Sequence, residues 1–322
     1  MYKKFFGLRE NPFNVNPDPR YLFLTPGTRE ALASLAYGIR SRKGIILLTG
    51  EVGTGKTMLL NMLLDWLHHN RAATAFIFNT HLSTTELFEC LMADLGIPCE
   101  SRTKSEILIR LNRWLLDKYR AGQITVLIVD EAQSLSPQVL EEIRFLTNLE
   151  TSSEKLLQVV LSGQPELEER LKLPHLRQLR QRITVLCRTS ALSLEETRGY
   201  IAERLRIAGA NSGPIFSPEA IESIYHHARG IPRVINVLCE HALINSFADE
   251  QKLVTAAHVD GVAREFGLDS IEPTAPVDGS GRPNSAPSVE TVLRDLATLL
   301  DQLRQPASVA MGSGKGNYEP YS

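Results

Sequence analysis

Two patterns of apolar and polar positions follow one another along this chain. Up to about residue 190, short uninterrupted apolar runs alternate with longer segments in which apolar residues recur every three or four positions. Uninterrupted apolar runs are typical of parallel strands buried on both faces, and the wider spacing is typical of amphipathic helices. The expected strands are 44–49, 74–78, 124–129, 156–162 and 183–186. The pattern therefore predicts an α/β domain, a parallel sheet with helices on both faces.

Helices are expected both between these strands and after them. Those of the first domain are expected at 28–39, 58–67, 84–94, 104–120 and from 132 to 149, after Pro137. From about residue 191 the strand-like runs stop, and helices are expected at 194–208, 217–228, 232–248 and 255–266. The pair Ser217-Pro218 is a favourable helix start, because serine caps and proline suits the first turn. A small all-helical domain is therefore expected after the sheet.

These patterns divide the chain into three parts. Residues 1–190 form the core with an N-terminal arm, residues 191–268 form the helical domain, and residues 269–322 form a flexible tail. The tail is rich in proline, glycine and serine, which is a linker composition. Within it, residues 288–304 have the spacing of a short amphipathic helix, which would dock a partner or pack back on the protein.

The amino-acid composition and the net charge limit the classes of function that the protein can have. The hydrophobic content of 43%, the charged content of 22% and the net charge of −2 are those of an ordinary globular protein, without a global attraction to nucleic acid. The four cysteines form no C-x-x-C pair, which predicts reduced thiols. We found no signal peptide and no apolar stretch long enough to cross a bilayer, so a cytoplasmic location is expected.

A phosphate-binding loop is the most specific signal in the sequence. Residues 50–57 match the pattern G-x-x-x-x-G-K-[ST] at every required position, between a predicted strand and a predicted helix. The loop consists of Gly50, Glu51, Val52, Gly53, Thr54, Gly55, Lys56 and Thr57. Its backbone N–H groups would cradle phosphate oxygens, Lys56 would reach the β- and γ-phosphates, and Thr57 would ligate Mg²⁺. ATP and Mg²⁺ are the ligands expected here; a glycine-rich turn without a ligand is the alternative.

Two carboxylates follow the most apolar strand. Asp130 and Glu131 come directly after 124–129. In open α/β sheets, ligands bind at the carboxyl ends of the strands, so these residues and the loop should share one edge. This is a Walker B arrangement, in which Asp130 would hold Mg²⁺ and Glu131 would orient and deprotonate the attacking water. The alternative is a helix cap.

A polar side chain at the end of the strand 156–162 would lie between these two elements. It could contact the γ-phosphate or the water. Ser162 and Gln164 are both candidates, and the sequence does not choose between them.

Arginines are concentrated between residues 166 and 188. They are Arg170, Arg177, Arg180, Arg182 and Arg188. Three interpretations are consistent with this cluster: a solvated basic helix, an arginine finger donated to a neighbouring subunit's ATP, and a patch for a nucleic-acid backbone. Arg182 is the first choice for the finger and Arg177 the second.

Two further segments are candidates for the nucleotide site. Residues 1–26 hold many aromatics and prolines, which predicts an extended arm packed on the domain surface. Phe13 or nearby apolar groups would either line an adenine pocket or simply pack. Arg233, in the turn Gly-Ile-Pro-Arg that opens a helix, could reach back to the phosphates of the first domain.

Together these motifs resemble the AAA+ ATPases, and more narrowly the secretion ATPases called general secretion pathway protein A, or ExeA-like. The segments that carry the resemblance are 5–8, 11–13, 17–22, 29–32, 50–57, 130–133, 163–167, 181–183 and 230–236. The resemblance extends over about residues 1–268. Thr28 departs from the family pattern, where a histidine is expected. The secretion proteins also continue into a transmembrane helix and a periplasmic part, neither of which we expect from this sequence.

The resemblance implies roles for particular residues. Lys56 and Thr57 would bind phosphate and Mg²⁺, Asp130 and Glu131 would form Walker B, and Arg233 would be sensor 2. The segment 163–167 would carry sensor 1. The family fold would be a five-stranded parallel sheet with a helical lid, assembling with ATP between subunits.

Three functions are consistent with these expectations. The first is a Mg²⁺-dependent ATPase that forms a homo-oligomer, a ring or a filament, and acts on a protein partner in secretion or export. The second is an ATP-dependent DNA-binding regulator, similar to transposition helpers. The third is a nucleotide-gated switch that barely hydrolyses ATP.

Overall fold

We analysed the chain as a computed structural model. The structure describes residues 2–16, 18–78, 81–98, 103–211 and 213–268, together with residues 294, 295 and 298. Apart from these three residues, the amphipathic helix expected at 288–304 lies outside the described residues. The rest of the tail from residue 269 also lies outside them.

A five-stranded sheet forms the centre of the first domain. Its strands are β1 (Ile45–Thr49), β2 (Ala73–Ile77), β3 (Thr125–Val129), β4 (Leu157–Gly163) and β5 (Ile183–Arg188). They lie in the order β2-β3-β4-β1-β5, and every neighbouring pair is parallel. All residues of β1, β3 and β4 are buried, which explains why most of them are apolar. The predicted parallel sheet is confirmed.

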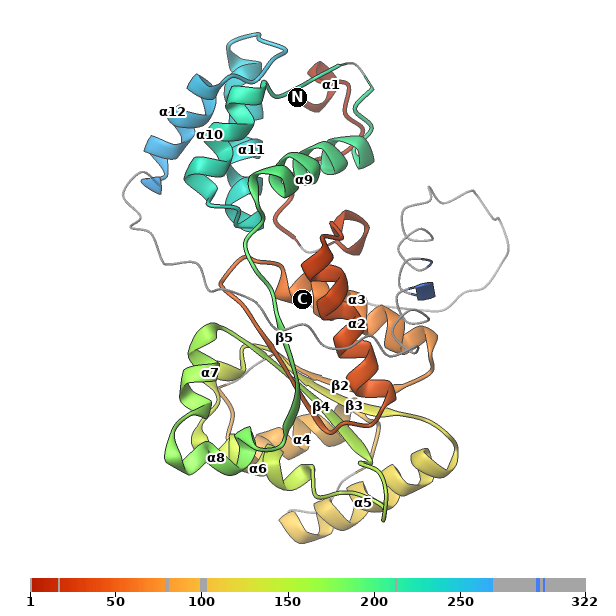
Figure 1. Cartoon of the computed structure of the whole chain (residues 1–322). Coiled ribbons are helices and arrows are strands. Elements are labelled where there is room, and N and C mark those ends of the chain that lie inside the picture. Colours follow the sequence, from red (N-terminus) through yellow and green to blue (C-terminus); the bar gives the residue numbers. More distant parts are fainter. Residues whose placement is uncertain are drawn as a thin grey trace, which may run out of the picture.

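Helices cover both faces of this sheet. One face packs against α2 (Pro26–Arg40) and α3 (Lys56–His69). The other packs against α4 (Thr84–Asp94), α5 (Lys104–Arg120), α6 (Pro137–Leu146) and α7 (Pro165–Leu171). Short helical turns complete the domain: η1 (Pro19–Tyr21), η2 (Ala132–Ser134), η3 (Pro174–Leu176) and α8 (Arg177–Arg180). Figure 1 shows these layers around the sheet.

The helix expected from 132 to 149 is divided into η2 and α6. The Ser136 hydroxyl accepts a hydrogen bond from the Val139 N–H at 3.3 Å and so caps a new helix, whose first residue is Pro137. Proline lacks the N–H that a continuous helix would need. The polypeptide therefore turns after β3 before α6 begins, and this turn carries Glu131.

A helical domain follows the sheet. It consists of α9 (Leu194–Ile207), α10 (Pro218–Ala228), α11 (Pro232–Ala248) and α12 (Ala256–Glu265), close to the expected bounds. Ser217 caps α10 as expected, since its hydroxyl accepts from the Ala220 N–H at 3.1 Å. These helices share an apolar core of their own and lie together at one end of the molecule (Figure 1).

The N-terminal arm packs on the helical domain, although it was expected to belong with the core. It begins with α1 (Tyr2–Phe5), and Phe6, Leu8 and Phe13 are buried in the core that the helical domain forms. The ring of Phe13 meets that of Phe216 edge to face, with centroids 5.9 Å apart. The N-terminal arm therefore packs against helices from late in the sequence before the chain continues into α2 of the first domain.

Candidate active site

The phosphate-binding loop connects β1 to α3 at the carboxyl edge of the sheet. Gly53 and Gly55 have φ values of 82° and 101°, which side chains with a Cβ rarely adopt. The Lys56 ammonium donates to the carbonyl oxygens of Gly50 at 2.6 Å and Glu51 at 3.0 Å. It therefore lies across the mouth of the loop, where a phosphate-binding lysine is needed.

Lys56 also shows that the loop and the two carboxylates share one site. Its side chain is buried, and burial lowers the pKa of its ammonium. The nearby carboxylates of Glu131 and Asp130 act in the opposite direction and raise it. A buried cation near two carboxylates at a sheet edge is an arrangement typical of functional sites.

Asp130 and Thr57 fit the requirements of a Mg²⁺ site. Asp130 is 7% exposed, and its Oδ1 accepts from the Ser162 hydroxyl at 2.7 Å and from the Glu131 N–H at 2.9 Å. Its other oxygen accepts no hydrogen bond from the described residues, and the Thr57 side chain is exposed at the start of α3. A hydroxyl and a carboxylate are hard oxygen donors of the kind that Mg²⁺ prefers.

Glu131 has an uncommon backbone conformation. Its φ and ψ are 52° and 36°, in the left-handed region that residues other than glycine rarely adopt. Two hydrogen bonds fix the turn: its N–H donates to Asp130, and its carbonyl accepts from the Ser134 N–H at 2.9 Å. Backbone strain of this kind is typically found at functional positions, where it aims a side chain.

Two amides hold the Glu131 carboxylate. Its Oε2 accepts from the Gln133 Nε2 at 2.5 Å and from the Gln164 Nε2 at 3.4 Å. Gln133 in turn accepts the Gln164 backbone N–H at 3.1 Å. Gln164 therefore faces Glu131, whereas Ser162 is buried and faces Asp130. The two sensor candidates thus contact different carboxylates.

The helical domain touches the phosphate-binding loop directly. The Arg233 N–H donates to the Gly53 carbonyl at 3.2 Å, and the Arg233 side chain is exposed beside the loop. Gly230 makes this approach feasible, because a Cβ there would lie 1.9 Å from the Leu192 carbonyl oxygen. Arg233 is thus placed where it could contact a phosphate in the loop.

A cavity lies beside the loop, between the core and the helical domain. The empty space there, open solvent at its mouth included, is about 640 Å³. Its walls include Thr54 and Gly55 of the loop, Tyr21 to Phe23 of the arm, and Tyr200 and Arg204 of α9. The cavity has the mixture of apolar and polar walls that a nucleoside needs. Phe13 is not among its lining residues, but other aromatic groups of the arm are.

The five arginines between residues 166 and 188 differ in their contacts. Arg170 donates to the carbonyls of Gln133 and Leu135, and Arg188 pairs with Glu168 at 2.7 Å. The Arg182 guanidinium donates to the Thr147 hydroxyl at 2.8 Å and to the Arg144 carbonyl at 3.3 Å. The side chains of Arg177 and Arg180, both on α8, are exposed and make no hydrogen bond or ion pair with other described residues.

Comparison with known proteins agrees with this geometry. A family model described as an AAA domain matches residues 39–171. General secretion pathway protein A of Aeromonas hydrophila is 45% identical to this chain over 249 residues, which are 77% of this chain and 45% of that protein. The chain belongs to the AAA+ family, in the branch of general secretion pathway protein A. It spans less than half the length of this relative.

Solved structures share the AAA+ fold. The Aeropyrum pernix ORC2 protein, in ADPNP–ADP complexes, superposes with a TM-score of 0.59 and is 17% identical, over 82% of this chain and 75% of that chain. The Aeropyrum pernix ORC1 protein in complex with DNA gives 0.57 and 17%, over 91% of this chain and 85% of that chain. At this identity the likeness concerns the fold alone.

The helices in the part of the chain that the structure describes include no candidate membrane span. None of its helices combines sufficient length with sufficient apolarity to cross a bilayer.

Several residues around the site carry no role in the sequence-based predictions. Gln133, Thr189, Tyr200 and Arg204 were missed. The Thr189 hydroxyl lies 2.7 Å from that of Thr54, in the segment that connects the two domains. The only local signal was the position of Gln133 two residues after Glu131. The others reach the site through folding of segments that are distant in sequence.

Proposed function

We propose that this AAA+ protein is a Mg²⁺-dependent ATPase that assembles with copies of itself and acts on a protein partner in secretion or export. The observation that carries the proposal is the meeting of Lys56, Asp130 and Glu131 at one edge of the sheet, where β1 and β3 lie on either side of β4 and Asp130 accepts from Ser162 of β4. The name of the Aeromonas relative supports the secretion context. A cytoplasmic site of action is part of the proposal, because ATP is available there.

In the proposed reaction, water attacks the γ-phosphate in line with the leaving oxygen. Glu131 accepts the proton of that water, and the amides of Gln133 and Gln164 fix the direction of its carboxylate. Lys56 and the N-terminus of α3 stabilise the charge on the phosphates. Mg²⁺ would be held by Thr57 and Asp130 and would neutralise part of that charge. Gln164 is our choice for sensor 1, since it contacts Glu131.

The finger is assigned to Arg177 in place of Arg182. The Arg182 guanidinium already binds within its own subunit, next to the end of α6. Arg177 is exposed on α8 and has no such contact among the described residues. An arginine that completes a neighbour's site must be exposed and unpaired before assembly. Arg177 meets both conditions, and so does Arg180.

Loss of the finger should abolish turnover without abolishing ATP binding. Arg177→Ala is expected to lower kcat by about 10³-fold or more, because such an arginine stabilises transition-state charge. The decisive measurement mixes Arg177→Ala subunits with Glu131→Gln subunits, each inactive alone. Random 1:1 assembly should restore about a quarter of wild-type turnover, since a quarter of interfaces combine an intact Glu131 with an intact neighbouring arginine.

Arg180→Ala is the matched control for this mixture, because Arg180 lies on the same helix and is equally exposed. It should retain turnover. If the mixture stays inactive while Arg177→Ala alone is inactive, the arginine does not act across a subunit boundary. Full activity of the Arg177→Ala variant would show that Arg177 is not the finger. If Arg180→Ala is inactive alone and regains turnover when mixed with Glu131→Gln subunits, the finger is Arg180.

The DNA-binding alternative stays a prediction that no observation favours. Three of the clustered arginines, Arg170, Arg182 and Arg188, are engaged in contacts within the chain. The remaining two form too small a group to make a phosphate-backbone patch by themselves. The switch without hydrolysis is distinguished from an ATPase by turnover alone.

A further inference from the structure

Arg204 on α9 is a buried cation that pairs with no carboxylate in the part of the chain that the structure describes. It is 3% exposed, and its hydrogen bonds with the described residues all go to neutral acceptors. Its Nε donates to the Pro12 carbonyl at 2.6 Å, one Nη to the Asn14 carbonyl at 3.2 Å and the other to the Tyr200 hydroxyl at 2.7 Å. Burying an arginine with only neutral acceptors is costly, so its position calls for an explanation.

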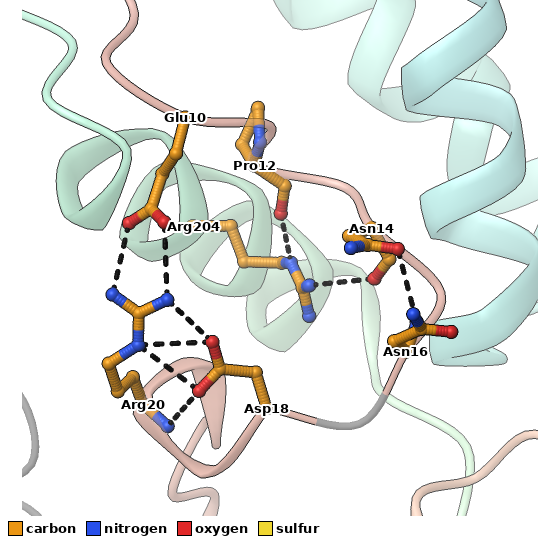
Figure 2. Close-up of polar contacts among 7 residues, drawn as sticks. All are labelled: Glu10, Pro12, Asn14, Asn16, Asp18, Arg20 and Arg204. Atoms are coloured by element: carbon orange, nitrogen blue, oxygen red, sulfur yellow. Dashed lines mark hydrogen bonds and ion pairs between the residues drawn. The ribbon is translucent and has the colours of Figure 1, made fainter. Parts of the chain in front are cut away.

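The arm is wrapped around this guanidinium. Figure 2 shows that Arg204 points at the carbonyls of Pro12 and Asn14, while Arg20 joins Glu10 to Asp18 beside it. The Arg20 guanidinium lies 3.1 Å from Glu10 and 2.6 Å from Asp18. These ion pairs close the arm into a loop, and Arg204 fastens that loop to α9.

Arg204 also supports one wall of the cavity beside the phosphate-binding loop. Its guanidinium carbon lies 4.6 Å from the ring centre of Tyr21 and 5.2 Å from that of Tyr200. All three side chains line the cavity, which Thr54 and Gly55 line on the phosphate side. The cation thus fixes two aromatic rings through cation–π contacts, at the end of the cavity that is contributed by the arm and α9.

Arg204 is also linked, through Tyr200, to α11, the helix that touches the phosphate-binding loop. The Tyr200 hydroxyl donates to Asn236 Oδ1 at 2.9 Å, and Asn236 lies on α11. That helix begins beside the loop, where the Arg233 N–H binds the Gly53 carbonyl. A continuous set of contacts therefore connects the arm, the cavity wall and the start of α11 through Arg204.

We propose that Arg204 is a positioning residue that sets the affinity for the nucleoside part of the nucleotide. It does so by holding Tyr21 and the arm as one wall of the cavity. The proposal rests on the proposed binding of ATP. The phosphate-binding loop makes its own contacts, so the affinity for a phosphate chain that carries no nucleoside should not depend on Arg204.

Binding of two ligands to four proteins tests this assignment. Wild type, Arg204→Met, Arg204→Lys and Arg206→Met are titrated calorimetrically with ATP and with inorganic triphosphate, both in Mg²⁺. Arg204→Met should weaken ATP binding about tenfold or more, and Arg204→Lys by a smaller factor, because lysine keeps the charge but cannot reach three acceptors. Both variants should bind triphosphate within about twofold of wild type.

Arg206→Met is the matched control. Arg206 lies on the same helix, is exposed and pairs with Glu203 at 2.8 Å, so its loss should change neither affinity. If Arg204→Met does not fold, Arg204→Lys carries the comparison. A second readout is hydrogen exchange of residues 10–23, which ATP should slow in wild type and slow less in Arg204→Lys.

The outcomes separate this proposal from the function on which it rests. Unchanged ATP affinity in both Arg204 variants overturns the positioning role. An equal loss for ATP and triphosphate also overturns it, because that result means general damage to the fold. Failure of wild type to bind either ligand overturns the proposed ATP binding itself.

Discussion

Replacing Glu131 by glutamine should lower steady-state ATP hydrolysis by about 10²- to 10⁴-fold, the range that a positioned general base contributes. Glutamine has nearly the same shape and keeps contact with Gln133 and Gln164, but it cannot accept the proton of the attacking water. Binding of ATP should therefore be retained. Phosphate release and calorimetric ATP affinity, measured on the same preparation, separate the two effects.

Glu169→Gln is a suitable control for this variant. Glu169 lies on α7, is exposed and pairs with Lys172, so the substitution makes the same change of charge away from the site. It should hydrolyse ATP at the wild-type rate. Unchanged turnover in Glu131→Gln would show that Glu131 is not the base.

Replacing Lys56 by alanine should remove nucleotide binding as well as turnover. The buried ammonium lies across the mouth of the loop, and no other described side chain is hydrogen-bonded to the carbonyls of both Gly50 and Glu51. We expect a loss of about 10²- to 10³-fold or more in turnover, the range that one stabilising donor contributes, together with a large rise in the Kd for ATP. Titration with ATP and Mg²⁺ measures the second effect.

Lys43→Ala is the corresponding control, because Lys43 is exposed just before β1 and lies at the opposite end of that strand from the loop. It should bind ATP as wild type does. Retained ATP binding by Lys56→Ala would contradict the assignment of the loop as the phosphate site. Thermal unfolding of each variant distinguishes loss of the ligand from loss of the fold.

The sheet and the loop were predictable because their signals are local. β1, β3 and β4 are buried on both faces, and that position favours apolar residues, so the strands are visible as mostly apolar runs. The polar exceptions Gln158 and Ser162 are buried but hydrogen-bonded. The loop and the Asp130-Glu131 pair could be placed together because parallel strands bring their carboxyl ends to one edge. Helix starts such as Ser217 were visible because serine and proline act within one turn.

Other parts of the site depend on contacts between distant segments. The choice between Ser162 and Gln164 as sensor 1 depends on which carboxylate each side chain contacts. The alternation of side chains along a strand does not predict that contact. The packing of Phe13 on the helical domain is decided by Phe216, which is some two hundred residues away. Arg204 looks like any exposed arginine of an amphipathic helix until the arm is folded over it.

The measurement that tests the central claim most directly is phosphate release from ATP by the wild-type protein, at increasing protein concentration, with Mg²⁺ and with excess EDTA. A composite site shared between subunits predicts turnover that requires Mg²⁺ and whose rate per subunit rises with concentration until assembly is complete. Absence of turnover at every concentration, or turnover that persists in EDTA, would contradict a Mg²⁺-dependent ATPase. A rate per subunit that does not change with concentration, over a range in which sedimentation shows assembly, would contradict the shared site.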